Sequence, residues 1–292
     1  MKARRSTLLA EAKGRRWRNW FDFPEDVMLL IFMKLGPMEI LFRAQFVCSS
    51  WQKLAQEPKL YTCLVMTRCG YFKTDDYDRF TEVGKEVVAR SSGELTEIYM
   101  EDLVTEELLK YIAEKSNSLK SLRLKHCEDI DEVLEEVVKE NPMLEELEFS
   151  GCEIGVETIE KVVCSCSQLK SFLLNFDPTR QSEFSRNESD NVAYAIGKNL
   201  PQLRRLHLYW NALTDDGLRA ILDGCPNLKF LDIRYCENLN LQGVLLQTCL
   251  DRMTYFWFGS DSIFGSEAEG DVESYDFDTD INVKDLWSRE TY

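Results

Sequence analysis

The most constraining feature of this chain is a short apolar pattern that recurs at nearly even intervals. Neighbouring copies of the template L-x-x-L-x-L, with Ile, Met or Phe allowed at the apolar places, are 24, 25, 25, 34, 25 and 25 residues apart. Self-similarity at this period is the signature of a solenoid, in which stacked units share one core. Six full copies and a truncated seventh begin at Leu95, Leu119, Leu144, Leu169, Leu203, Leu228 and Met253.

Each copy predicts a short strand followed by a helix. Alternate side chains such as Leu122 and Leu124 face the same way in an extended chain. Further on, Leu218 and Leu222 share one face of a helix for which Asp215 is the expected N-cap. The predicted fold class is therefore α/β, a curved solenoid with parallel strands inside and helices outside.

The cysteines follow the same repeat. The chain has ten cysteines and two histidines. Structural zinc requires paired ligands at close spacing, and only Cys164 and Cys166 form a close pair, so we expect reduced thiols and no metal. Six cysteines occupy two recurring interior positions, the turn after the strand (Cys127, Cys152, Cys236) and the end of the helix (Cys166, Cys225, Cys249).

This pattern resembles the cysteine-containing subclass of leucine-rich repeats, over about residues 83–258. Leu103 and Asp177 stand where the first and fourth copies lack the turn cysteine, and Asn211 takes that place in the fifth. The fourth copy also carries an insertion, in "PTRQSEFSRNESDN", that we expect to loop out of the solenoid. A tolerated surface loop is favoured over a functional one.

Residues 22–61 precede the repeats and predict three short helices. The first begins at Pro24 and stops at Gly36-Pro37, "MEILFRA" forms the second, and "VCSSWQKLAQE" forms a third that Pro58 closes. From Val27 to Leu35 only Lys34 is polar. So small a unit cannot bury all of these side chains, so the surplus must contact either the repeats or another protein.

This N-terminal segment resembles an F-box from Phe23 to Tyr61. It carries F-P-E-D-V-x-x-x-I-F-x-x-L, then I-L, V-C-x-x-W-x-x-L and L-Y, with Phe23 for the usual Leu and Tyr61 for the usual Trp. Some of the family's adaptor-binding positions also serve the core of the domain. The resemblance implies an adaptor-binding face formed by Pro24, Val27, Ile31, Phe32, Leu35, Val47, Cys48, Trp51 and Leu54.

An F-box followed by leucine-rich repeats resembles the substrate-receptor subunits of plant SCF ubiquitin ligases. The resemblance implies that the F-box docks on a Skp-type adaptor, which joins cullin and RING subunits, and that the repeats bind the protein to be ubiquitinated. It implies no catalytic residue and no cofactor in this chain. The alternative is a leucine-rich-repeat scaffold or ligand-sensing protein without a role in ubiquitin transfer. An enzyme with a thiol nucleophile is least favoured, because two histidines offer little choice of base.

The substrate site is predicted on the concave face of the last three strands, where aromatic and basic side chains gather as in a binding hot spot. For Tyr255 and Trp257, covering the open end of the solenoid is an equally supported role. We expect His207 to be a surface recognition residue, since no evident partner for it stands in the sequence. The predicted substrate-binding residues are Arg205, His207, Tyr209, Phe230, Asp232, Arg234, Tyr255 and Trp257.

Charge and hydropathy narrow the class of protein further. The net charge of −16 argues against nucleic acid as a partner, and no apolar run is long enough to span a membrane. A secretory signal is not evident, so we expect the protein in the nucleus, the cytoplasm or both. We expect a basic tail over 1–20, the F-box over 21–62, a linker or first solenoid cap over 63–82, repeats over 83–258 and an acidic tail without fixed structure over 259–292.

Overall fold

The computed structural model describes residues 23–67, 76–175, 189–259 and 262–264, and it divides the chain into two compact units between Ala55 and Gln56. The predictions for the basic N-terminal segment, and for most of the fourth-repeat insertion and of the acidic C-terminal segment, lie outside these residues. Residues 262–264 form a strand, so the expectation of no fixed structure over 259–292 is wrong for them, and residues 189–191 of the insertion belong to a helix. Among the helices described, none combines the length and the hydropathy that a membrane span requires.

The N-terminal unit is helical, and a glycine breaks its first helix. Gly36 has φ 81° and ψ 161°, a conformation essentially restricted to glycine, so helix α2 bends at the predicted Gly-Pro position. Pro24 immediately precedes α2, and its carbonyl accepts a hydrogen bond from Met28 N at 3.1 Å. The elements of this unit are α2 (Glu25–Phe42), the 3₁₀ helix η2 (Ala44–Phe46) and α3 (Ser49–Leu54).

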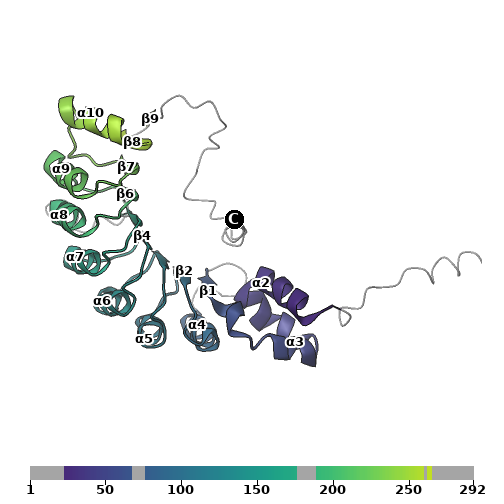
Figure 1. The fold of residues 1–292 in the computed structure, drawn as a ribbon. Helices are drawn as coiled ribbons and strands as arrows, with labels where there is room; N and C mark the ends of the chain where they lie inside the picture. Colours follow the sequence, from purple (N-terminus) through teal and green to yellow (C-terminus); the bar gives the residue numbers. More distant parts are fainter. Residues whose placement is uncertain (1–22, 68–75, 176–188, 260–261, 265–292) are drawn as a thin grey trace, which may run out of the picture. The chain divides into compact units, whose positions relative to one another are not determined.

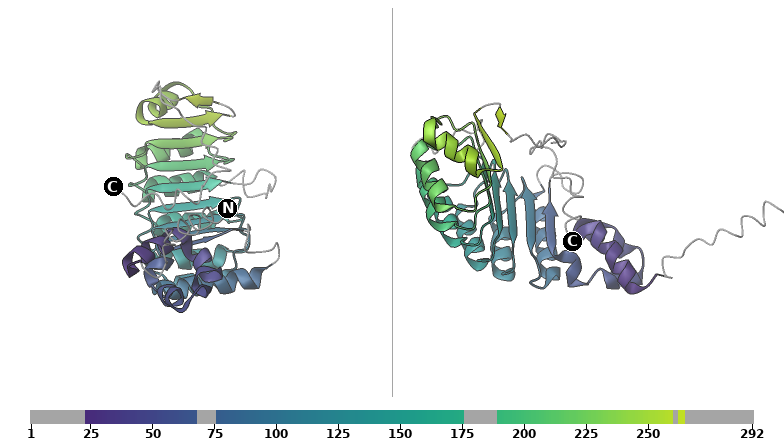
Figure 2. Two further views of the ribbon diagram at one scale, coloured as in Figure 1. Left: turned by 90° about the vertical axis from the view of Figure 1, so that its right-hand side faces the viewer. Right: turned by 45° about the horizontal axis from the view of Figure 1, so that its top comes forward.

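The second unit is a repeat solenoid. Strands β1 to β8 are parallel and follow one another in sequence order, and β9 adds to β8 in the antiparallel sense (Figures 1 and 2). The strands are β1 (Cys63–Met66), β2 (Glu97–Glu101), β3 (Ser121–Lys125), β4 (Glu146–Ser150), β5 (Ser171–Asn175), β6 (Arg205–Tyr209), β7 (Phe230–Arg234), β8 (Tyr255–Gly259) and β9 (Ser262–Phe264).

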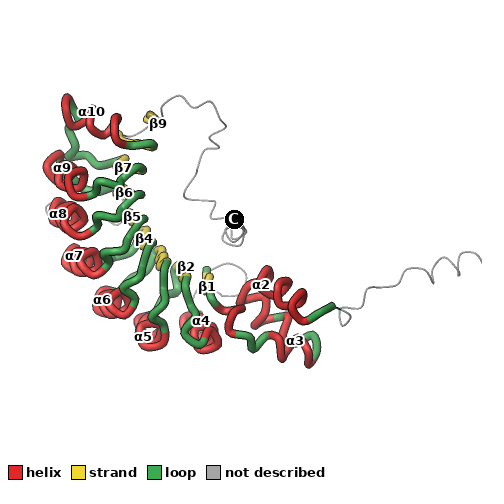
Figure 3. Tube along the Cα trace, viewed as in Figure 1, coloured by secondary structure: helices red, strands yellow, loops and turns green. Residues whose placement is uncertain are grey.

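Helices cover one side of this sheet. They lie along the outer side of its curve while the strands line the inner side, which confirms the predicted α/β solenoid (Figure 3). The helices are α4 (Tyr77–Ser91), α5 (Glu106–Lys115), α6 (Asp131–Glu140), α7 (Val156–Ser165), α8 (Ser189–Asn199), α9 (Asp215–Gly224) and α10 (Gly243–Arg252), and the 3₁₀ helix η3 (Pro58–Tyr61) precedes β1.

The template leucines set the strand register. Each of β2 to β8 begins two residues after the first apolar residue of its template, as β3 does after Leu119. Leu122 pairs with Leu147 and Leu124 with Phe149, and all four side chains are buried between the sheet and the helices. Burial of such side chains, at about 25 cal/mol per Å² of apolar surface, is the main force that stacks the repeats.

The sheet begins earlier than the predicted repeat boundary at residue 83. Strand β1 pairs with β2 through Leu64↔Ile98 and Met66↔Met100, within the segment expected to be a linker or cap. Tyr61, the last residue of the F-box motif, is fully buried and takes the place that Leu95 takes in the next repeat. The F-box motif and the first repeat therefore share this residue.

The cysteines occupy the interior positions that the repeat predicts. The thiols of Cys127, Cys152 and Cys236 donate to the carbonyls of Lys125, Leu124 and Leu208 at 3.2, 3.3 and 3.1 Å. All six repeat cysteines are buried and unbridged. Burial raises the pKa of Cys166 and Cys236 to about 12 and that of Cys225 and Cys249 to about 11, so these thiols stay protonated.

One helix start differs from the prediction. The N-cap of α9 is Thr214, whose Oγ1 accepts from Asp216 N at 3.2 Å, and the expected Asp215 is the first residue of the helix. The Oδ1 atom of Asp215 instead accepts from Asn240 N of the next repeat, at 2.9 Å. The carboxylate therefore joins two repeats rather than capping its own helix.

Candidate interaction surfaces

The N-terminal unit divides the nine predicted adaptor-binding residues by exposure. Phe32 and Leu54 are buried, and Phe32 packs edge-on against Trp51 at 5.2 Å between ring centroids, so Phe32 and Leu54 belong to the core. Leu35 is 39% and Val47 61% exposed, and Pro24 is also exposed. The other four are half-buried: Val27, Ile31, Cys48 and Trp51.

Two further apolar side chains of this unit are more exposed than Leu35 and Val47. Leu30 is 63% and Phe46 73% exposed. A signal for both stands in the sequence, because Leu30 lies in the apolar run of the first helix and Phe46 directly precedes the V-C-x-x-W motif. Several exposed apolar side chains on so small a unit are typical of a protein-interaction surface.

The inner face of the repeat unit is formed by the strand residues that alternate with the apolar ones. Among the charged residues of β3 and β4, Arg123 Nη2 lies 3.3 Å from Glu146 Oε2, and Lys125 Nζ lies 3.6 Å from Glu148 Oε1. Glu146 also reaches Arg205 on β6, at 3.3 Å from Nη2. Cations and carboxylates on this part of the face therefore neutralise one another.

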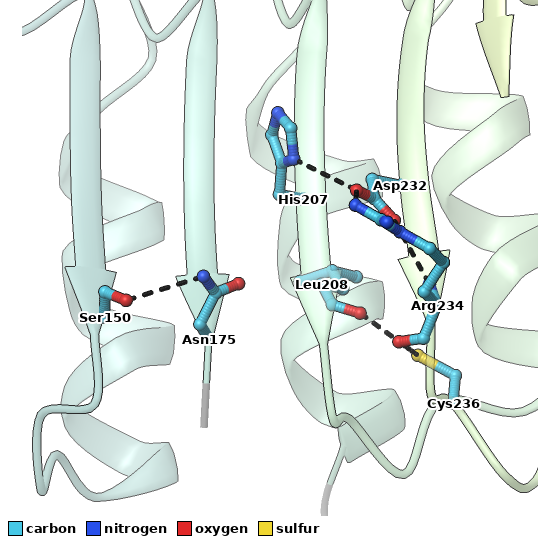
Figure 4. Close-up of polar contacts among 7 residues, drawn as sticks. All are labelled: Ser150, Asn175, His207, Leu208, Asp232, Arg234 and Cys236. Atoms are coloured by element: carbon cyan, nitrogen blue, oxygen red, sulfur yellow. Dashed lines mark hydrogen bonds and ion pairs between the residues drawn. The ribbon is translucent and has the colours of Figure 1, made fainter. Parts of the chain in front are cut away.

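The burial of two predicted substrate-binding residues corrects the expectation for them. His207 is 6% and Asp232 2% exposed, and His207 Nδ1 lies 3.6 Å from Asp232 Oδ2 (Figure 4). His207 is thus a buried residue with a carboxylate partner on the neighbouring strand. No sequence signal indicates this pair, because the two residues are 25 positions apart and meet only through the register His207↔Asp232.

Arg234 completes this cluster. Its Nε donates to Asp232 Oδ1 at 3.0 Å and its Nη2 to Asp232 Oδ2 at 2.8 Å, a two-pronged contact (Figure 4). Burial alone raises the pKa of Asp232, but the contacts from His207 and Arg234 outweigh it and hold that pKa below its ordinary value. Asp232 is therefore an ionised, buried anchor for two side chains.

Aromatic rings surround Arg234. Its guanidinium carbon lies 4.6 Å from the ring centroid of Tyr209 and 6.0 Å from that of Trp257. Phe230 is close to two further rings, 4.6 Å from Trp257 and 5.7 Å from Tyr255 by ring centroids. The structure therefore gathers the aromatic residues predicted for the site into one cluster across β6, β7 and β8.

The sheet continues one strand beyond β8, which carries Tyr255 and Trp257. Strand β9 pairs with β8 through Phe256↔Phe264, Trp257↔Ile263 and Phe258↔Ser262, and so occupies the edge of β8. Tyr255 remains 50% exposed and Trp257 half-buried. The backbone of β9, rather than these two side chains, extends the sheet at this end.

In the ranges that the structure describes, no group of three or more His, Cys, Asp or Glu side chains has the geometry of a metal site. The His207–Asp232 pair lies against Phe230, with 4.7 Å between the His207 and Phe230 ring centroids, and strands β6 and β7 contain no Ser, Thr or Cys. The arrangement presents the cation of Arg234 beside aromatic rings, which is chemistry suited to a binding surface.

A helical unit with exposed apolar side chains, followed by a solenoid of strand–helix repeats, defines an F-box protein with leucine-rich repeats. The model of the F-box-like family matches residues 20–67, and leucine-rich-repeat models match residues 140–162 and 203–226. The F-box-like match extends over β1, in agreement with the overlap at Tyr61.

Curated relatives place the chain in the same family. It is 38% identical to the F-box protein SKIP19 of Arabidopsis thaliana over 269 residues, which are 91% of this chain and 85% of the relative. It is 32% identical to the putative F-box/LRR-repeat protein 9 of that plant, over 80% of this chain and 95% of the relative. It is 37% identical to the putative F-box/LRR-repeat protein 23, of which it spans about half, 53%. The chain belongs to the F-box/leucine-rich-repeat family.

Proposed function

We propose that this protein is a substrate-recognition subunit of an SCF-type ubiquitin ligase. The proposal rests on the presence of two features in one chain. One is an F-box unit with exposed apolar side chains, and the other is a repeat solenoid with polar and aromatic side chains on its inner face. The first binds a Skp-type adaptor, and through it cullin and RING subunits. The second binds the protein to be ubiquitinated.

The receptor acts by proximity. It performs no catalytic step, and it raises the effective concentration of client lysines near the ubiquitin-charged enzyme of the complex. Its buried, protonated thiols suit a reducing compartment, so we place its action in the nucleus, the cytoplasm or both.

The adaptor-binding face is tested best at exposed positions, because variants at Phe32 or Leu54 disturb the core. We expect Leu35→Asp combined with Val47→Asp to abolish co-purification with a co-expressed Skp-type adaptor. The repeats should remain folded in this variant, and circular dichroism checks this. Retention of the adaptor at the wild-type level would refute the proposed face.

A matched control is available in the repeat unit. Val244 on α10 is 84% exposed, so Val244→Asp makes the same chemical change on an apolar side chain outside the F-box. This variant should retain the adaptor fully. If it loses the adaptor to the same extent, the loss reflects general damage rather than the F-box surface.

A further inference from the structure

Arg234 is held more rigidly than a surface arginine. Both oxygens of the buried Asp232 accept from it, and Tyr209 and Trp257 lie beside its guanidinium at 4.6 and 6.0 Å. His207 contacts the same carboxylate and fixes it from β6. Because Arg234 loses its side-chain freedom on folding, little entropy remains to be lost when a ligand binds it.

One edge of the guanidinium faces away from Asp232. The contacts to Asp232 use Nε and one side of Nη2, and among the described residues no hydrogen bond or ion pair involves Nη1. The side chain is 31% exposed. A guanidinium edge with two parallel N–H groups matches the two oxygens of a carboxylate.

The charge around Arg234 also favours an anion. On strands β6, β7 and β8 the sequence has two arginines, Arg205 and Arg234, and a single carboxylate, Asp232. Asp232 is buried and already in contact with Arg234 and His207, and Glu146 of β4 contacts both Arg205 and Arg123. Three arginines thus share two carboxylates here, and the side chains of Arg205 and Arg234 remain 47% and 31% exposed, in a chain whose net charge is −16.

Apolar surface borders the cations on two sides. Trp257 lies beside Arg234, and it contacts Phe230 at 4.6 Å and stacks with Tyr255 at 6.0 Å between ring centroids. At the ends of β6 and β7, Trp210 and Tyr235 form a second stack, 4.5 Å apart and 2° from parallel, and Trp210 is 37% exposed. Rings in this arrangement offer rigid contact area to apolar side chains.

We infer that this surface binds an acidic segment of a client protein, in which an Asp or Glu carboxylate faces Arg234 and neighbouring apolar side chains lie on the rings. We call it the Arg234 patch, formed by Arg205, Tyr209, Trp210, Phe230, Arg234, Tyr235, Tyr255 and Trp257. The inference rests on the proposed function, because it names the chemistry of the client that the receptor recognises.

The test uses the full chain in complex with its adaptor and a short fluorescent synthetic peptide in which Asp and Glu alternate with Leu and Phe. Arg234→Gln and Arg234→Lys should each weaken peptide binding roughly tenfold or more, because Lys lacks the two-pronged geometry. Arg219→Gln, the same change on the outer helix α9, should leave the affinity unchanged. Equal affinity of wild type and Arg234→Gln would overturn the inference.

A second variant guards against loss of fold. Arg234→Gln leaves the buried Asp232 with His207 alone, whereas Arg205→Gln leaves Glu146 its contact with Arg123. Arg205→Gln should weaken binding of the peptide severalfold and leave the thermal unfolding midpoint of the protein unchanged.

A peptide with Gln and Asn in place of Glu and Asp should bind to the wild-type chain at least roughly tenfold more weakly. Equal binding of the two peptides would show a purely apolar site.

Two other occupants are distinguished in the same assay. A peptide that binds only when it carries phosphoserine would assign the site to phosphate and overturn the carboxylate. If the wild-type chain fails to bind the peptide and the variant Asp276→Asn, Asp278→Asn, Asp280→Asn binds it, the occupant is the chain's own acidic segment and not a client. Retention of the adaptor in every preparation separates failure of this inference from failure of the proposed function.

Discussion

At the scale of single residues, the inner face depends on one buried carboxylate. Asp232 joins His207 of β6 to Arg234 of its own strand, and it keeps its charge because both contacts favour the ionised form. A buried charge without partners would be strongly destabilising. The cluster is therefore both a structural element and the support of the proposed binding arginine.

The depressed pKa of Asp232 predicts a pH-dependent contribution to stability. Because the folded state binds this proton less readily than the unfolded state, the contribution is complete above the unfolded pKa and is lost as the pH falls through the folded pKa. We expect Asp232→Asn to lower the free energy of unfolding by about 1 to 3 kcal/mol at neutral pH. The difference from wild type should shrink below about pH 4.

Urea unfolding at several pH values measures this effect. Asp216→Asn is the control, since Asp216 is exposed on α9 and its side chain contacts Arg219 there. It should change the free energy of unfolding by no more than about 0.5 kcal/mol at any pH. A constant difference between wild type and Asp232→Asn across the acid range would contradict the assignment of the shift to Asp232.

Two neighbouring cysteines predict contrasting reactivity. Cys164 is exposed, whereas Cys166 is fully buried with its pKa raised to about 12, although only Ser165 separates them. Mass spectrometry after brief treatment of the native protein with iodoacetamide should find Cys164 modified and Cys166 intact. Both should react after unfolding in urea. Equal rates of modification of Cys164 and Cys166 in the native protein would show that the end of helix α7 is open to solvent rather than packed.

At the scale of secondary-structure elements, acidic side chains join successive repeats. Asp131 Oδ1 accepts from Gly155 N at 2.8 Å, and Asp215 does the same for Asn240. Asp190 accepts both from Thr214 N, at 3.0 Å, and from Thr214 Oγ1, at 2.6 Å. Each carboxylate comes from the start of one helix and orders the chain just before the next, so these contacts set the spacing of the helix layer.

The Asp190 contact predicts a measurable loss of stability. Asp190→Ala leaves Thr214 N without its acceptor and removes a partner from the residue that caps α9. We expect the free energy of unfolding to fall by about 1 to 3 kcal/mol. Asp216→Ala in the first turn of α9 should cost less than about 1 kcal/mol. If Asp216→Ala cost more than Asp190→Ala, the negative charge in the first turn of α9 would matter more than the hydrogen bonds from Thr214 to Asp190.

Most strands and helices of the repeat unit could be predicted from the repeat pattern. The strands that lack the full L-x-x-L-x-L template could not. Every template from Leu95 to Met253 became a strand, because alternation of apolar side chains fixes both strand and register. Strand β1 was missed since Tyr61 replaces the first leucine of its template, and β9 since it follows no template. The burial of His207 was not predictable either, because it arises from Phe230 and Asp232 on the neighbouring strand.

At the scale of the whole molecule, the two units provide different kinds of surface. The F-box unit exposes apolar side chains such as Leu30, Leu35 and Val47, while the inner face of the repeats exposes arginines and aromatic rings. Two surfaces of unlike chemistry suit two unlike partners, as the proposed role of a receptor that links a ligase to its client requires. A scaffold without a ligase would have no need of the F-box surface.

Affinity capture with quantitative mass spectrometry tests this central claim most directly. Wild-type chain expressed in plant cells should capture adaptor, cullin and client proteins together. The Leu35→Asp, Val47→Asp variant should lose adaptor and cullin but keep its clients, which should accumulate in the cells because they are no longer ubiquitinated. Capture of cullin by the variant at the wild-type level, or wild-type complexes without cullin, would contradict the assignment of this chain as a substrate receptor of an SCF-type ligase.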